Sequence, residues 1–67
     1  MYKFTNVNSS AISKVGYDKE NERLTVVFNH GAEYEYSHIP EQEFKNLVSA
    51  PSVGRYYNQH IRGLNSN

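Results

Sequence analysis

The sequence predicts an α+β fold: a three-stranded antiparallel β-meander followed by two short helices packed on one face of the sheet, in the order β-β-β-α-α. Three observations predict this architecture. Apolar residues alternate along residues 23–37, which is typical of a β-hairpin with one buried face. The apolar period lengthens to that of a helix after Pro40. The chain has 67 residues, which is room for one core only.

The hairpin of residues 23–37 determines its own register. A loop of two residues would bring glutamates onto the apolar face, opposite Phe28. A loop of residues 29–31 instead pairs Val26 with Tyr34 and keeps the glutamates on the other face. A slip of one residue turns every side chain of a strand over, so the three-residue loop is predicted. Its last residue is a glycine, which suits the left-handed backbone of such loops.

The first strand of the meander is predicted within residues 10–18, with Val15 and Tyr17 on one face. Ile12 joins that face only if a β-bulge intervenes. Residues 1–9 are an N-terminal tail or an edge strand, and both interpretations stay open.

Two helices are predicted after Pro40. Apolar residues at i, i+3 and i+4 indicate a short amphipathic helix that ends before Pro51. Ser52 is suited to cap a second helix over residues 53–62. The expected core consists of Val15, Leu24, Val26, Phe28, Tyr34, Tyr36, Phe44, Leu47, Tyr57 and Ile61.

Composition bounds the class of protein. A single domain is expected over residues 10–64, with residues 65–67 as a disordered tail. The chain has no cysteine, so disulfides and thiolate metal sites are excluded. The N-terminal residues lack the apolar run of a signal peptide, and no stretch is apolar enough to span a membrane. A cytoplasmic location is therefore expected.

Charge is unevenly distributed along the chain. Residues 1–43 carry four basic and seven acidic side chains, a net charge of −3. Residues 44–67 carry three basic side chains and no acidic one, a net charge of +3. The overall charge of zero argues against indiscriminate binding to nucleic acid, whereas the basic C-terminal third favours a local anion-binding surface.

An ordered set of residues carries a family resemblance. The set is Ser10, Ile12, Val15-Gly16-Tyr17-Asp18, Leu24, Val26, Phe28, Gly31, Tyr34-Glu35-Tyr36, Pro40, Leu47, Ala50, Ser52, Gly54-Arg55-Tyr56-Tyr57-Asn58 and Ile61. With this set, residues 9–61 resemble the KTSC domain, a small module of bacteria and their phages that is also found at the C-terminus of some lysyl-tRNA synthetases. The resemblance implies RNA binding as the suggested role. Tyr57 departs from the expected Phe, and its hydroxyl needs solvent or a partner if the ring is buried.

The strongest candidate site is the polar face of the second predicted helix. It consists of Arg55, Tyr56, Asn58, Gln59, His60 and Arg62. The arginines and amides recur at i, i+3, i+4 and i+7, so they form one stripe that suits phosphate oxygens and base edges. The tyrosine and histidine form an adjacent i, i+4 pair that suits stacking on an unpaired base. A solvated helix face without a ligand is the alternative.

These residues favour a non-enzymatic binding module, with RNA as the first partner to consider. The alternative is a protein-interaction module or a homodimer with no nucleic-acid role, because the first strand can present a free edge. No catalytic constellation occurs, and the three histidines lack ligand spacing, so neither a metal nor a cofactor is expected. Tyr34 and Tyr36 resemble the base-stacking pairs of RNA-recognition sheets, but the hairpin register predicts that both rings are buried.

Overall fold

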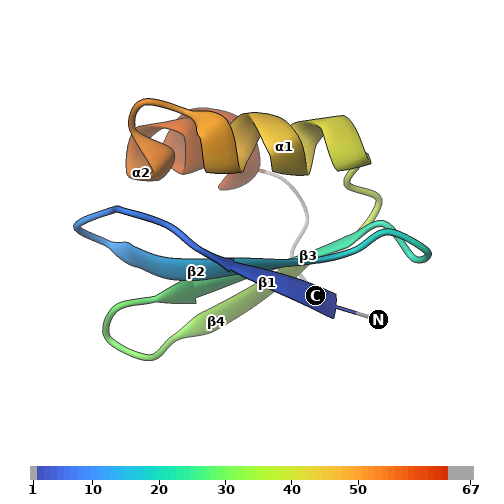
Figure 1. The fold of residues 1–67 in the computed structure, drawn as a ribbon, viewed down its shortest axis with the longest axis horizontal. Helices are drawn as coiled ribbons and strands as arrows, with labels where there is room; N and C mark the ends of the chain where they lie inside the picture. Colours follow the sequence, from blue (N-terminus) through green and yellow to red (C-terminus); the bar gives the residue numbers. More distant parts are fainter. Residues whose placement is uncertain (1, 64–67) are drawn as a thin grey trace.

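The computed structural model describes residues 2–63 and has two layers, a four-stranded antiparallel sheet and a helical layer over one of its faces (Figure 1). The strands are β1 (Tyr2–Asn6), β2 (Ile12–Asp18), β3 (Arg23–Phe28) and β4 (Glu33–Tyr36), and they lie side by side in chain order. The helical layer consists of α1 (Glu41–Ser49), α2 (Val53–Tyr56) and the π-helical turn η1 (Tyr57–Ile61). The expected tail, residues 65–67, lies outside the described residues.

The α+β class is confirmed, but the prediction of three strands is wrong, because β1 adds an edge strand to the sheet. It pairs antiparallel with β2, with Phe4 opposite Gly16. The Phe4 ring lies over Gly16, where a Cβ would overlap it. The ring also stacks on Tyr2, at 5.9 Å between centroids. Because Gly16 has no side chain, the Phe4 ring can pack against β2 and hold β1 at the edge of the sheet.

The predicted hairpin register is confirmed. Val26 pairs with Tyr34, and Leu24 pairs with Tyr36. The Phe28 amide donates to the Ala32 carbonyl at 2.8 Å across the three-residue loop. Gly31 ends the loop with φ of 100°, a conformation that glycine adopts without strain.

A β-bulge brings Ile12 into the core. The sequence predicted that Ile12 would share a face with Val15 only if such a bulge were present. The register between β2 and β3 shifts between Ile12 and Lys14. The extra residue places Ile12 on the same face as Val15. Both side chains are buried beneath the helices.

The core differs from the prediction mainly at Tyr34, which is 48% exposed. Its cross-strand partner, Val26, is fully buried, so the predicted register of the hairpin is correct. Tyr34 is exposed because no helix packs over it. The helical layer reaches Tyr36 but ends before Tyr34, which lies on the edge strand β4. Four buried apolar residues were absent from the expected core: Ile12, Tyr17, Ile39 and Val53.

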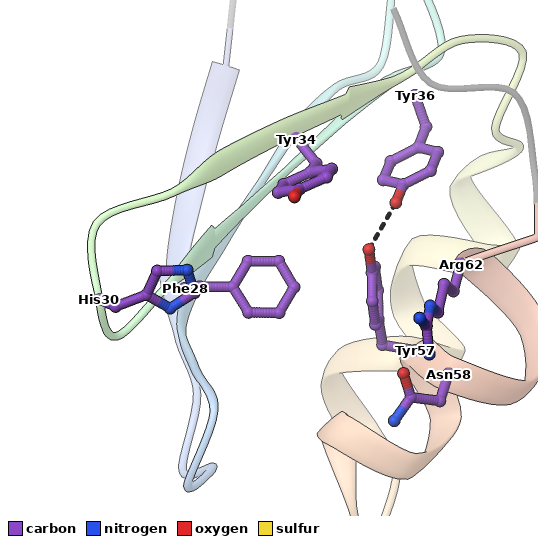
Figure 2. Close-up of a pocket in the computed structure, with 7 residues that line it drawn as sticks. All are labelled: Phe28, His30, Tyr34, Tyr36, Tyr57, Asn58 and Arg62. Atoms are coloured by element: carbon purple, nitrogen blue, oxygen red, sulfur yellow. Dashed lines mark hydrogen bonds between the residues drawn. The ribbon is translucent and has the colours of Figure 1, made fainter.

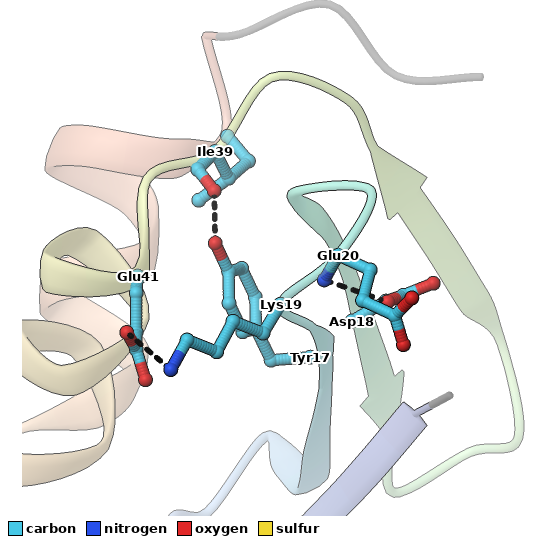
Figure 3. Close-up of polar contacts among 6 residues, drawn as sticks. All are labelled: Tyr17, Asp18, Lys19, Glu20, Ile39 and Glu41. Carbon is cyan, nitrogen blue, oxygen red and sulfur yellow. Dashed lines mark hydrogen bonds and ion pairs between the residues drawn. The ribbon is translucent and has the colours of Figure 1, made fainter.

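Tyr17 joins the sheet to the start of α1 (Figure 3). Its hydroxyl donates to the Ile39 carbonyl at 2.5 Å, and its ring stacks on Phe44 at 5.0 Å between centroids. Burial, and then the nearby carboxylate of Glu22, raises the pKa of Tyr17. The hydroxyl therefore stays a donor at neutral pH. These two contacts hold the start of α1 against the sheet. Among residues 2–63 the longest helix is α1, and no helix there is long and apolar enough to span a membrane.

The second predicted helix begins where expected, because the Ser52 side chain accepts a bond from the Arg55 amide. It does not stay α-helical. From Tyr57 the turn widens, and the Arg62 amide donates to the Tyr57 carbonyl at 2.8 Å. The buried positions of this segment recur every four residues, which is longer than the 3.6-residue α-helical turn. The wide turn therefore keeps Ile61 in the core.

Candidate functional site

An open hollow lies between the β3–β4 hairpin and η1, with a volume of about 390 Å³ (Figure 2). We call it the tyrosine hollow. Its lining residues are Phe28, His30, Tyr34, Tyr36, Tyr57, Asn58 and Arg62. The lining contains four aromatic rings besides a histidine, one guanidinium and one amide, and no carboxylate. Such a surface suits a flat or anionic ligand.

Phe28 holds the aromatic wall of the tyrosine hollow together. Its ring meets Tyr34 edge-on at 5.6 Å and Tyr57 edge-on at 5.4 Å, measured between centroids. It therefore supports the Tyr34 ring from one side while about half of that side chain remains exposed. The exposed ring is a stacking platform that the core already holds in place.

The inner wall of the hollow is a pair of buried hydroxyl groups. Tyr36 hangs from β4 and Tyr57 rises from η1, and their hydroxyl oxygens are 2.5 Å apart (Figure 2). Both residues are buried. Burial, and then the bond to Tyr57, raises the pKa of Tyr36, so this hydroxyl is neutral at physiological pH. The predicted need of the Tyr57 hydroxyl for a partner is confirmed.

A second hollow, of about 540 Å³, lies between the β1–β2 loop and the start of α2. We call it the serine hollow. It is lined by Asn8, Ser9, Ser10, Ala11, Pro51, Ser52, Val53, Gly54, Arg55, Asn58 and Gln59. No carboxylate contributes to this lining either, and Asn58 lines both hollows. The two hollows therefore adjoin on one side of the molecule.

The six predicted site residues lie on the continuous helical segment formed by α2, η1 and the residue that follows η1. Arg55 and Gln59 line the serine hollow, whereas Arg62 lines the tyrosine hollow. Asn58 lies between them. Asn58 lines both hollows, so the predicted stripe runs from one hollow into the other.

Tyr56 and His60 stack on each other, with ring centroids 4.2 Å apart. The Tyr56 hydroxyl donates to the Glu43 carboxylate at 2.5 Å, and this bond raises the pKa of Tyr56. The expected i, i+4 pair therefore exists, but one face of each ring is occupied by the other. This pair is less available to a base than Tyr34 is.

The two arginines of the site are free of acidic neighbours. Arg55 and Arg62 are exposed, and neither forms an ion pair within residues 2–63. The hairpin register places Glu33 and Glu35 on the far face of the sheet, where Glu35 pairs with Arg23 at 3.3 Å. The basic character of the C-terminal third is thus retained on the side that carries the hollows.

No group of three metal-ligating side chains comes together in the part of the chain that the structure describes. Five residues of the tyrosine hollow are absent from the predicted site: Phe28, His30, Tyr34, Tyr36 and Tyr57. The Tyr-x-Tyr pattern of β4 is a signal for two of them, Tyr34 and Tyr36, but the hairpin register assigned both to the core. That interpretation holds for Tyr36 and fails for Tyr34.

The fold and these hollows define a class: a small α+β module that presents aromatic rings and unpaired arginines at the join of its sheet and its last helix. The KTSC domain family model matches residues 8–64. The chain belongs to the KTSC domain family.

Relatives include both short proteins and parts of long ones. An uncharacterized protein of Stutzerimonas stutzeri is 40% identical over 53 residues, which cover 79% of this chain and 75% of the relative. A protein of Tsukamurella paurometabola is 42% identical over 56 residues, 84% of each chain. The lysine–tRNA ligase of Nostoc punctiforme is 35% identical over 54 residues, which are 81% of this chain and 10% of the ligase.

The fold has a solved counterpart. The crystal structure of a KTSC domain protein from Yersinia pestis superposes with a TM-score of 0.93 at 32% sequence identity. The alignment covers 100% of this chain and 96% of the other. The four-stranded sheet with its helical layer is therefore the architecture of this family.

Proposed function

We propose that this protein is a cytoplasmic, non-enzymatic module that binds single-stranded RNA across the tyrosine and serine hollows. The single observation that carries the proposal is the union of Arg62, Asn58 and the exposed Tyr34 ring in one hollow without a carboxylate. An arginine suits a phosphate, and an exposed tyrosine suits the face of an unpaired base.

The two arginines extend this site beyond a single nucleotide. Arg55 and Arg62 lie in adjoining hollows that share Asn58. A flexible strand can therefore place successive phosphates on the two guanidinium groups, with the amide between them. Base-paired RNA fits this path poorly, since its bases are stacked and its edges are turned inward. The similarity to lysine–tRNA ligases, enzymes that act on tRNA, supports RNA as the partner.

The direct test is fluorescence anisotropy with a labelled single-stranded RNA, at low and at moderate salt. We expect Arg62→Ala and Arg55→Ala each to weaken binding and to lower the salt slope by about one counterion. Lys45→Ala is the matched control, because it removes one exposed positive charge from α1, which lies outside both hollows. Absence of wild-type binding, or equal losses for all three variants, would contradict the proposal.

A second candidate function has an observation of its own. Phe4 is 49% exposed on the edge strand β1, so a protein partner or a second copy of the chain can pair with this edge. Light scattering over a range of concentrations distinguishes the homodimer. A mass that stays that of the monomer at every concentration would remove the homodimer, and a dimer that persists in Phe4→Ala would show that the Phe4 ring does not contribute to it.

A further inference from the structure

The Tyr36–Tyr57 hydroxyl pair at the inner wall of the tyrosine hollow has one O–H donor that its mutual hydrogen bond does not use. Each neutral tyrosine hydroxyl carries one donor and can also accept. The bond between Tyr36 and Tyr57 uses one of the two protons, whichever residue donates. The second proton has no acceptor within residues 2–63, although both side chains are at least 94% buried.

A buried donor without an acceptor is uncommon in folded proteins, because its loss of water is not compensated. Here the donor lies at the wall of an open hollow, so a ligand can compensate it (Figure 2). The Tyr36 hydroxyl stays protonated, since burial disfavours its anion. The pair therefore presents one O–H donor, from whichever residue accepts the mutual bond, to whatever enters the hollow.

We propose that the Tyr36–Tyr57 hydroxyl pair selects a base with a keto oxygen, as in uracil or guanine, inserted beside Tyr34. The inference rests on the proposed function. It deepens that function by naming the residues that distinguish one base from another. The volume of about 390 Å³ lies at the small end of the range of ligand sites, so the hollow holds one nucleotide and not a longer stretch of strand.

The three contacts of this nucleotide have distinct roles. Tyr34 supplies a ring face, which accepts any base. Arg62 supplies a charge for the phosphate, which carries no sequence information. The hydroxyl pair donates to the base edge from a buried position, so it discriminates between bases at a fixed place, beside the exposed Asn58 amide of the same hollow. Uracil offers this donor two keto oxygens at its Watson–Crick edge, whereas adenine offers a single ring nitrogen beside an amino group that is itself a donor.

The test compares oligouridylate and oligoadenylate of equal length, by anisotropy, on wild type and on the double variant Tyr36→Phe/Tyr57→Phe. The double variant keeps both rings and removes both hydroxyls, so no buried donor is left without a partner and the fold is retained. We expect the wild-type preference for uridylate to fall by about fivefold, the equivalent of one hydrogen bond. The self-stacking of oligoadenylate cancels, because the ratio of affinities is compared between the two proteins.

The control is Tyr2→Phe, which removes a tyrosine hydroxyl from β1, at the opposite edge of the sheet from β4. It should leave the ratio unchanged. If wild type binds both oligonucleotides equally, or if the double variant keeps the wild-type ratio, the base-selection inference is overturned while RNA binding stands. If no oligonucleotide binds at all, the proposed function fails first and this inference fails with it.

Discussion

Tyr57 links the stability of the core to the chemistry of the site. Its ring packs edge-on against Phe28 and Tyr36. Within residues 2–63, its hydroxyl is the only hydrogen-bond partner of the Tyr36 hydroxyl. The family resemblance implies Phe at this position. This chain therefore has a second hydroxyl where the resemblance implies an apolar edge.

We predict that Tyr57→Phe lowers the free energy of unfolding by about 1 kcal/mol, because it leaves the buried Tyr36 hydroxyl without its partner. Urea denaturation followed by circular dichroism measures the change. The double variant with Tyr36→Phe should recover most of the loss. A double variant that is less stable than the single one would show that the hydroxyl pair contributes more than its mutual bond.

Asp18 makes stability depend on acid pH. Its carboxylate accepts from the Asn21 side chain at 2.8 Å, in the turn between β2 and β3. It also accepts from the Glu20 amide at 3.1 Å (Figure 3). The bond from Asn21 is the main cause that holds the pKa of Asp18 below its usual value. The folded state thus favours the charged form.

Protonation of Asp18 is coupled to unfolding, because the pKa of this carboxyl is lower in the folded state than in the unfolded state. A depressed pKa contributes stability above the unfolded value of about 3.9, and that contribution is lost as the pH falls through the lower folded value. We predict that the thermal midpoint of wild type falls more steeply below about pH 4 than that of Asp18→Asn. Parallel curves for the two proteins would show that this carboxylate does not contribute to acid unfolding.

Strand β1 illustrates what a local pattern leaves out. Residues 1–9 alternate only weakly, so tail and edge strand were equally compatible with the sequence. The decision comes from Gly16 on the neighbouring strand, which leaves space for the Phe4 ring. That complementarity joins residues that are twelve positions apart, and periodicity within one segment does not report it.

We predict that Gly16→Ala destabilises the protein by about 1 kcal/mol or more, because the new Cβ overlaps the Phe4 ring. Backbone amide exchange should rise along β1 and remain unchanged in α1. The matched test is Gly16→Ala in a Phe4→Ala background, where the overlap is gone. If the cost is the same in both backgrounds, the ring is not the cause.

The second helix shows a further limit of sequence reasoning. Its start and its cap were predicted correctly, as was the burial of Tyr57 and Ile61, whereas Val53 is a core residue that the expected core left out. The π-helical turn was not predicted, because it results from fitting a four-residue repeat to the sheet beneath it. Arg62 directly follows this turn and lines the tyrosine hollow, whereas Arg55 lines the serine hollow.

The fold class and the hairpin register followed from the sequence, because each depends on residues close together in the chain. The tyrosine hollow did not follow. It joins residues 28–36 to residues 57–62, and its exposed ring depends on where the helical layer ends. The alternation along β4 assigned a face to Tyr34, and only the tertiary structure shows that this part of the face is uncovered.

The charge distribution along the chain becomes a distribution over the surface. The glutamates of β4 lie on the open face of the sheet, whereas Arg55 and Arg62 lie on the side of the hollows. A net charge of zero thus conceals a molecule with a distinct basic side. Attraction to a polyanion would be local and oriented, as the proposed RNA-binding role requires.

The order of the strands in the sheet is also their order in the chain. Each ladder therefore closes a short hairpin, and no strand has to wait for a distant segment before it can pair. Contacts between residues near in sequence cost little loop-closure entropy, and domains built from them fold rapidly. The sheet of such a chain can pair quickly, which leaves its strand edges little time to meet those of another chain.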